Sequence, residues 1–242
     1  MYAVKIEGLT KKYKDVTAVD NLSLTVKNGE LMSLLGVNGA GKTTLIKMLS
    51  CLARPTTGEA FLNGKSIISE SNDVKRMIAV SPQETAVASG LSVRENLELM
   101  CGIYGFDREK RESKIKELTE LLDLSSVIHK KSGKLSGGWQ RRLSIAMALI
   151  SEPEILFLDE PTLGLDVIVR SELWDIICAL KGKVTVILTT HYMEEAEELS
   201  DRVAIMKDGR LIVCDTPEKI KASAGCDSFE KAFISYIKGD VK

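Results

Sequence analysis

Residues 31–50 read LMSLLGVNGAGKTTLIKMLS, and this stretch decides which fold the rest of the chain can form. An apolar run at 31–35 precedes a glycine-rich segment, and a helical pattern follows at 43–50. Residues 36–43 fit G-x-x-x-x-G-K-[ST], a loop whose glycines let backbone N–H groups wrap phosphates. Because the loop stands between strand and helix patterns, the sequence predicts a phosphate site at the start of an α/β unit.

The side chains of this loop fit a nucleoside triphosphate. Lys42 can reach the β- and γ-phosphates, and Thr43 can hold Mg²⁺. A chance glycine-rich turn would lack the strand before it and the helix after it. The remaining predicted nucleotide-binding residues of the loop are Gly36, Asn38, Gly39, Gly41 and Thr44.

Composition limits what else the chain can do. It has 242 residues, 44% of them hydrophobic and 28% charged, which suits one large globular domain or two modest lobes. A formal net charge of -1 gives no field to hold nucleic acid, so we expect no nucleic-acid partner. No signal peptide is visible, and no apolar run approaches the roughly 20 residues of a spanning helix. We expect a soluble chain, with any membrane span supplied by another subunit.

The five cysteines are odd in number and form no CxxC pair. They lie mostly among apolar residues. We therefore interpret them as small core side chains in a reducing cytosol rather than as disulfides or a zinc site. They are Cys51, Cys101, Cys178, Cys214 and Cys226.

Hydrophobic patterning predicts an α/β core. Nearly continuous apolar runs are typical of parallel strands covered on both faces, and alternation is typical of half-exposed antiparallel strands. The runs are at 31–35, 155–158 and 184–188, and the alternating segments are at 4–9 and 22–26. Helical patterns at 43–50, 166–180 and 194–199 follow the runs, and an Asp-Gly turn between 203–206 and 211–213 predicts a hairpin.

The segment 84–150 has a different pattern. Ser92 and Glu95 form a capping box, and apolar stripes at helical spacing follow without any strand pattern. We expect a helical subdomain at 84–150, inserted into an α/β core made of 1–83 and 151–223 with an antiparallel β subdomain. A helical tail, 224–242, follows and carries a short amphipathic helix at 229–237.

Two further strand ends carry candidate catalytic groups. The run 155–158 delivers Asp159 and Glu160 at its carboxyl end, where ligands bind in open α/β sheets. Asp159 would bind Mg²⁺, and Glu160 is placed to act as general base on the attacking water. His191 follows the run 184–188; from local pattern alone, a structural and a functional histidine are equally favoured.

A second glycine-rich turn, Ser136, Gly137 and Gly138, opens an apolar helical pattern. Together with "SPQE", "ILFLDEP", "TLGLD" and the histidine, in that order, it makes nearly the whole chain resemble the nucleotide-binding subunit of an ATP-binding cassette (ABC) transporter. The resemblance implies a P-loop NTPase fold with ATPase activity. It also implies that Tyr13 stacks on adenine, that Gln83 touches Mg²⁺ and the attacking water, and that His191 senses the γ-phosphate.

The family resemblance also implies an assembly. Two cassettes close head to tail, each ATP lying on one P-loop and under the partner's Ser-Gly-Gly, while Asp166 crosses to the partner. A homodimer is the simplest solution, and a heterodimer with a related subunit stays open. Polytopic permease subunits would hold the chain at the cytoplasmic face of the membrane.

The stretch at 91–105 and the tail resemble cassettes of ABC-2 type exporters, which favours export. A non-transport role for a single cassette, in signalling, translation or DNA repair, is the alternative. Two positions depart from the family pattern: Trp139 stands where glutamine is usual, and Leu163 where a small serine is common. Trp139 could narrow the dimer interface or pack beneath it, and neither departure removes a group needed for hydrolysis.

Overall fold

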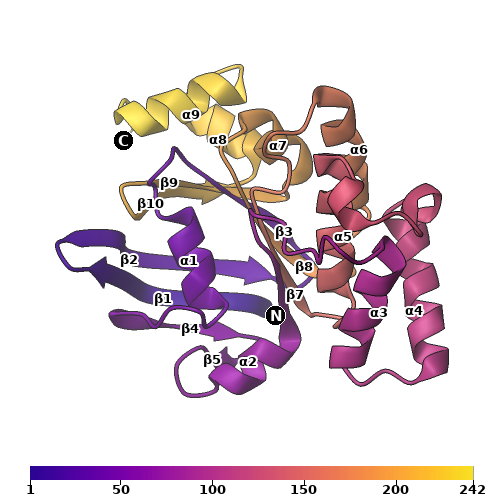
Figure 1. Ribbon diagram of the computed structural model, residues 1–242. Helices are drawn as coiled ribbons and strands as arrows, with labels where there is room; N and C mark the ends of the chain where they lie inside the picture. The colour runs from indigo at the N-terminus through magenta and orange to yellow at the C-terminus, as the bar shows by residue number, and fades with distance from the viewer. Residues whose placement is uncertain (242) are drawn as a thin grey trace.

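The computed structural model describes residues 1–241, whose strands form two sheets (Figure 1). The larger sheet has the order β10-β9-β3-β8-β7-β6. All neighbours in it are parallel except the β9–β10 hairpin. Its strands are β3 (Leu31–Leu35), β6 (Ile78–Ser81), β7 (Ile155–Asp159), β8 (Thr185–Thr190), β9 (Arg202–Lys207) and β10 (Arg210–Asp215).

The smaller sheet is antiparallel, with the order β2-β1-β4-β5. The alternating segments predicted at 4–9 and 22–26 are confirmed as strands, and both extend further than the pattern. Strands β4 and β5 were not predicted, because they are short and break the alternation with glycine. The four strands are β1 (Tyr2–Tyr13), β2 (Val16–Lys27), β4 (Thr57–Leu62) and β5 (Lys65–Ser66).

Helices cover the larger sheet. Between residues 84 and 150 every helix or strand element is helical, and the capping box of Ser92 and Glu95 is confirmed. The helices are α1 (Lys42–Leu49), α2 (Ser71–Met77), α3 (Val93–Ile103), α4 (Arg108–Leu121), α5 (Gly137–Leu149), α6 (Val167–Cys178), α7 (Met193–Leu199), α8 (Pro217–Ser223) and α9 (Phe229–Lys238). Two short 3₁₀ turns, η1 (Ser125–Val127) and η2 (Ser132–Lys134), join α4 to α5.

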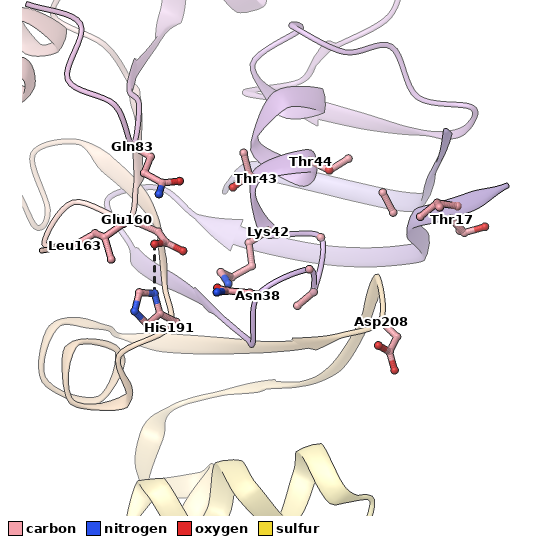
Figure 2. A pocket seen from close by; sticks show the side chains of 15 residues that line it. Thr17, Asn38, Lys42, Thr43, Thr44, Gln83, Glu160, Leu163, His191 and Asp208 are labelled. Atoms are coloured by element: carbon pink, nitrogen blue, oxygen red, sulfur yellow. Dashed lines mark ion pairs between the residues drawn. The ribbon is translucent and has the colours of Figure 1, made fainter. Parts of the chain in front are cut away.

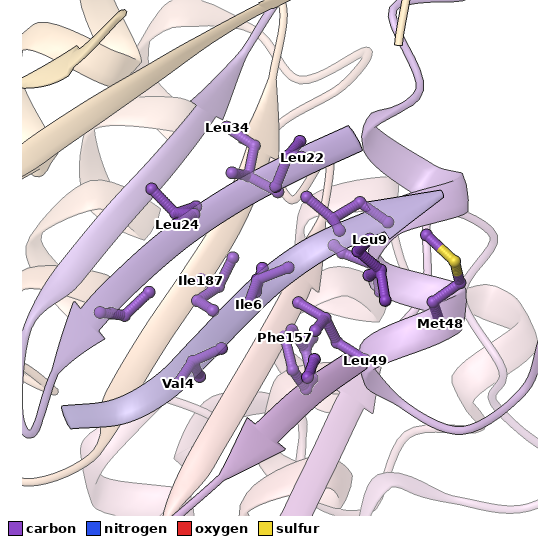
Figure 3. Close-up of a cluster of buried hydrophobic side chains, with 14 of the residues drawn as sticks. Val4, Ile6, Leu9, Leu22, Leu24, Leu34, Met48, Leu49, Phe157 and Ile187 are labelled. Carbon is purple, nitrogen blue, oxygen red and sulfur yellow. The ribbon is translucent and has the colours of Figure 1, made fainter. Parts of the chain in front are cut away.

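The parallel strands separate two hydrophobic cores. In β7, Ile155 and Phe157 face the core shared with α1 and the antiparallel sheet, whereas Leu156 and Leu158 face the core shared with α3–α6. Figure 3 shows the first core, with Phe157 near side chains of β1 and α1. Because alternate side chains of a strand point to opposite faces, both faces of β7 are buried and its carboxyl end is held rigidly.

The cysteine interpretation is wrong for Cys178, whereas the other four cysteines lie in the hydrophobic cores or pack against them. Only Cys101 is buried, Cys178 is exposed, and the other three are half-buried, although all five are free thiols. Cys178 is the last residue of α6, so its position on the helix, and not its apolar neighbours in sequence, sets its exposure. None of the helices within residues 1–241 combines the length and apolar character required to cross a bilayer.

Candidate nucleotide-binding site

A cavity of about 820 Å³ lies over the loop before α1. Figure 2 shows Gln83, Glu160 and His191 on one side of it, and Thr17 with Asp208 at the opposite end. The predicted loop residues Asn38, Gly39, Gly41, Lys42, Thr43 and Thr44 all line it. The structure thus brings together, around one cavity, side chains from loops after β3, β6, β7 and β8.

Two glycines let this loop fit between the sheets. A Cβ at Gly36 would lie 2.5 Å from the carbonyl oxygen of Met206, and one at Gly41 would lie 2.3 Å from that of Ala18. Gly41 also has a φ of 98° and forms the N-cap of α1 without any side-chain cap. The first N–H groups of α1 therefore stay free for an anion, where the helix dipole also favours negative charge.

Lys42 is the buried cation of the cavity. Its side chain is folded over the loop, where Nζ donates to the carbonyl oxygens of Gly36 at 2.6 Å and Val37 at 3.3 Å. Burial lowers the pKa of Lys42, and the carboxylates of Glu160 and Asp159 act in the opposite direction. An ammonium held by loop carbonyls can be taken over by phosphate oxygens, which form stronger charge-assisted bonds.

Asp159, buried at the end of β7, lies beside Thr43. The Thr43 hydroxyl donates to Oδ1 of Asp159 at 3.2 Å, and Thr189 of β8 donates to the same oxygen. Sequence reasoning missed Thr189, because only the parallel register of β7 and β8 places it opposite Asp159. These oxygens form a hard donor set of the kind that Mg²⁺ takes beside phosphate oxygens.

Glu160 begins the turn after β7 with a φ of 47°, in the left-handed region. Its N–H donates to the Thr189 hydroxyl at 2.9 Å, which fixes this uncommon backbone conformation. The carboxylate points into the cavity, with Oε2 lying 3.3 Å from Nδ1 of His191. Two predicted catalytic groups from neighbouring strands thus meet at one place.

Gln83 also lines the cavity, directly after the end of β6. Its backbone carbonyl accepts a 2.6 Å bond from the guanidinium of Arg141, which also donates to the Pro82 carbonyl at 2.6 Å. The sequence alone does not single out Arg141, because it is one of several polar residues that follow the glycine pair. Only the packing of α5 against β6 reveals the contact.

Tyr13 is not brought into the cavity lining. It is 46% exposed, and the ammonium of Lys11 lies 4.9 Å from its ring centre. Val16, Thr17 and Ala18 of β2 line the cavity instead, together with Asp208 of the β9–β10 turn.

The turn Ser136–Gly138 lies outside this cavity. Ser136 is the N-cap of α5, yet its exposed side chain caps no N–H group. A Cβ at Gly138 would lie 2.4 Å from Cγ1 of Val169 on α6, so this glycine sets how closely the two helices approach. Asp166 is the exposed N-cap of α6 and accepts from the N–H groups of Ile168 and Val169.

Trp139 is partly buried in the helical core, and the Arg142 guanidinium lies 4.8 Å from its ring centre. Arg142 is in turn paired with Glu172 of α6 at 2.6 Å. Within the described chain, the tryptophan therefore packs against the helical core and against the guanidinium of Arg142, a neighbour on the same helix.

Beneath the segment that joins Glu160 to α6 lies Glu195, which is fully buried. Its Oε1 accepts from the Thr162 hydroxyl at 2.8 Å and from the Trp174 indole at 3.1 Å, while Oε2 has no partner within the described residues. Burial raises the pKa of Glu195, against the effect of these hydrogen bonds. This group was not singled out from the sequence.

Comparison with known proteins gives consistent matches. Residues 19–163 match the family model described as "ABC transporter". The chain is 41% identical over 229 residues to the daunorubicin resistance ATP-binding protein DrrA3 of Streptomyces coeruleorubidus, a match that covers 94% of this chain and 72% of that protein. It is 39% identical over 230 residues to the Nod factor export ATP-binding protein I of Burkholderia orbicola, covering 94% and 75%.

Solved structures agree in fold. An ATP-binding subunit of an ABC transporter superposes with a TM-score of 0.85 at 26% identity, covering 97% of this chain and 99% of the other. A dimeric post-hydrolysis state of the ATP-binding cassette MJ0796, bound to ADP and Pi, gives 0.78 at 28% identity, covering 88% and 98%. The predicted α/β P-loop fold is confirmed by both.

Proposed function

Because the chain belongs to the ABC transporter family, as one of its ATP-binding and ATP-hydrolysing subunits, we propose that two copies close head to tail around two ATP molecules. The observation that carries this proposal is that the two glycine-rich segments have different surroundings. The loop at 36–43 lies inside a built cavity, whereas the turn at Ser136 lies outside it with an uncapped, exposed N-terminus. An open turn of this kind suits an anion that is carried by a second chain.

In the proposed site, Lys42 binds the β- and γ-phosphates, and the free N–H groups of 36–44 surround them. Thr43, Asp159 and Gln83 would hold Mg²⁺, and the 3.2 Å contact between the oxygens of Thr43 and Asp159 supports a shared ion. Mg²⁺ there neutralises charge that develops on the transferring phosphoryl group. Both Tyr13 and the residues of β2 that line the cavity are candidates for the adenine end.

Glu160 is the proposed general base. Its carboxylate faces the cavity, where it can accept a proton from water lined up with the γ-phosphate. Nδ1 of His191 lies 3.3 Å from Oε2 of this carboxylate, so His191 would face the γ-phosphate in the proposed site. Loss of the γ-phosphate removes the contacts that hold the partner's Ser136, Gly137 and Gly138, so hydrolysis opens the dimer.

We propose that residues 84–150 act as a helical subdomain on a core of 1–83 and 151–223, with 224–242 as a tail. The helical subdomain would pass dimer closure to polytopic permease subunits, which hold the chain at the cytoplasmic face of the membrane. Export of a small molecule is supported by the names of the relatives, which describe drug resistance and Nod factor export.

The test is Glu160→Gln, which keeps the shape of the side chain but cannot accept a proton. Turnover should fall by about 10²- to 10⁴-fold, the range that general bases contribute. The purified variant should become dimeric with ATP and stay monomeric with ADP, as measured by light scattering. Unchanged turnover would remove Glu160 as the base, and an ATP-bound monomer would contradict the composite site.

A further inference from the structure

Three successive residues at the end of β6 are held by one face of α5. The hydroxyls of Ser81 and Ser144 are hydrogen-bonded at 2.9 Å. The guanidinium of Arg141 then donates to the Pro82 and Gln83 carbonyls, each at 2.6 Å. Residues 141 and 144 lie on the same side of a helix, so α5 supports the chain where the strand ends and Gln83 begins.

Holding the two carbonyls with Arg141 requires the burial of a charged side chain. It is 5% exposed, and no ion pair involves it within residues 1–241. Burial lowers the pKa of Arg141, although Asp159 and Glu195 act in the opposite direction. Burying a charge costs free energy unless the charged group is hydrogen-bonded, and the planar guanidinium presents its N–H groups in a fixed fork that matches these two adjacent carbonyls.

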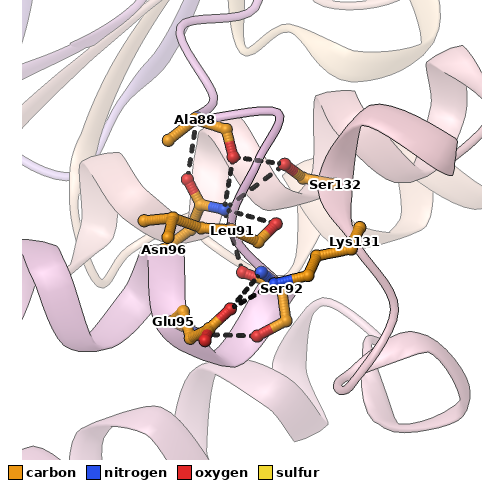
Figure 4. Close-up of polar contacts among 7 residues, drawn as sticks. All are labelled: Ala88, Leu91, Ser92, Glu95, Asn96, Lys131 and Ser132. Atoms are coloured by element: carbon orange, nitrogen blue, oxygen red, sulfur yellow. Dashed lines mark hydrogen bonds and ion pairs between the residues drawn. The ribbon is translucent and has the colours of Figure 1, made fainter.

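The loop that Gln83 opens is also held at its far end. Figure 4 shows Asn96, fully buried, accepting from the Ala88 N–H at 2.9 Å, and Ser132 donating to the Ala88 carbonyl at 2.8 Å. Gln140 of α5 donates to the Ser132 carbonyl at 3.2 Å. The loop is therefore fastened at both ends to the helix that begins at Gly137.

We infer that Arg141 is a positioning residue that sets the place of Gln83 in its own nucleotide site and ties it to the turn that caps the partner's nucleotide. This rests on the proposed head-to-tail dimer. Binding of the partner's ATP at the N-terminus of α5 would shift this helix as a rigid body. Through their hydrogen bonds, Arg141 and Ser144 would then shift residues 81–83 in the same direction. Engagement at one site thereby places Gln83 at the other.

A double-mutant cycle on the full chain tests the inference. Arg141→Met should lower kcat by about 10- to 100-fold, as displaced catalytic groups do, and leave the KM for ATP within about twofold. The Mg²⁺ concentration for half-maximal activity should rise, as it should in Gln83→Ala. The double variant should be no slower than Gln83→Ala alone. Arg141→Lys keeps the charge but loses the fixed two-pronged geometry of the guanidinium, so its effect should fall in between.

Arg142→Met is the matched control, since its side chain is equally buried but contacts Asp123 and Glu172. Any fold-reduction in kcat that it causes should multiply with that of Gln83→Ala, and the Mg²⁺ concentration for half-maximal activity should stay unchanged. The inference is wrong if the fold-reduction in kcat caused by Arg141→Met multiplies with that of Gln83→Ala, or if Arg141→Met keeps the wild-type kcat and Mg²⁺ dependence. The dimer proposal stands in either case. A wild-type chain without ATPase activity in the same assay would overturn both.

Discussion

Helix α1 starts directly after a glycine-rich loop and α5 starts with a pair of glycines, and neither has a side-chain cap. Around the start of α1 the loops after β6, β7 and β8 converge, and Lys42 is only 5% exposed. At the start of α5, Ser136 and Gly137 are exposed, and Gly138 is buried against α6. A helix N-terminus becomes a complete phosphate site through what surrounds it, and in the proposed dimer the partner's bound nucleotide would lie at the second one.

The largest expected effect comes from Lys42→Ala, which removes the cation from the complete site. Charge-assisted bonds to phosphate are the strongest in the cavity, so ATP affinity and turnover should each fall by about 100-fold or more. Isothermal calorimetry measures the affinity. Ser136→Arg should keep ATP affinity and lose turnover, because it blocks only the turn that would face the partner in the proposed dimer.

Mixing the two inactive variants sharpens this comparison. In a mixed dimer one composite site carries both changes and the other carries neither. Equimolar mixtures should therefore regain a fraction of wild-type turnover. Absence of any recovery, with mixed dimers shown to form, would mean that the two turns do not share a nucleotide across the interface.

A smaller effect is expected where α5 meets α6. Gly138→Ala places a Cβ 2.4 Å from Cγ1 of Val169 and should destabilise the fold by about 1–2 kcal/mol, as overpacking outweighs the better helix propensity. Thermal unfolding measures it. Gly137→Ala is the control, since its Cβ would have an ordinary 3.8 Å contact with Leu165. Failure of Val169→Ala to rescue Gly138→Ala would exclude the clash as the cause.

The smallest effect concerns Glu195, which lies beneath the segment that joins Glu160 to α6. Its folded-state pKa is raised above the ordinary 4.5 by burial, so the folded chain holds the proton to higher pH than the unfolded chain. Its contribution to stability therefore falls as pH rises through this window. Glu195→Gln should remove this pH dependence of stability. The Tm of the variant should therefore rise by a few degrees relative to that of the wild type as the pH increases. Exposed Glu198→Gln should leave the pH profile unaltered.

Local pattern was enough for the phosphate loop, because one short segment holds both the motif and its flanking strand and helix. Patterning also located β3, β7 and β8, whose buried faces require apolar residues throughout. Contacts that depend on register between distant elements were out of reach. Thr189 beside Asp159 and Arg141 beside Gln83 are ordinary residues in sequence and become distinctive only in the packed sheet.

The loop at 36–43 is wedged against backbone from both ends of the chain: Ala18 of β2, Met206 of β9, and Gly209, whose N–H donates to the Ala40 carbonyl at 3.2 Å. Contacts of such long sequence separation require a large loop-closure entropy to be overcome before they form. A nascent chain that has emerged only as far as β8 lacks part of the wall of its own ATP site. Nucleotide binding therefore reports the completion of folding, and ATP stabilises only chains that have reached it.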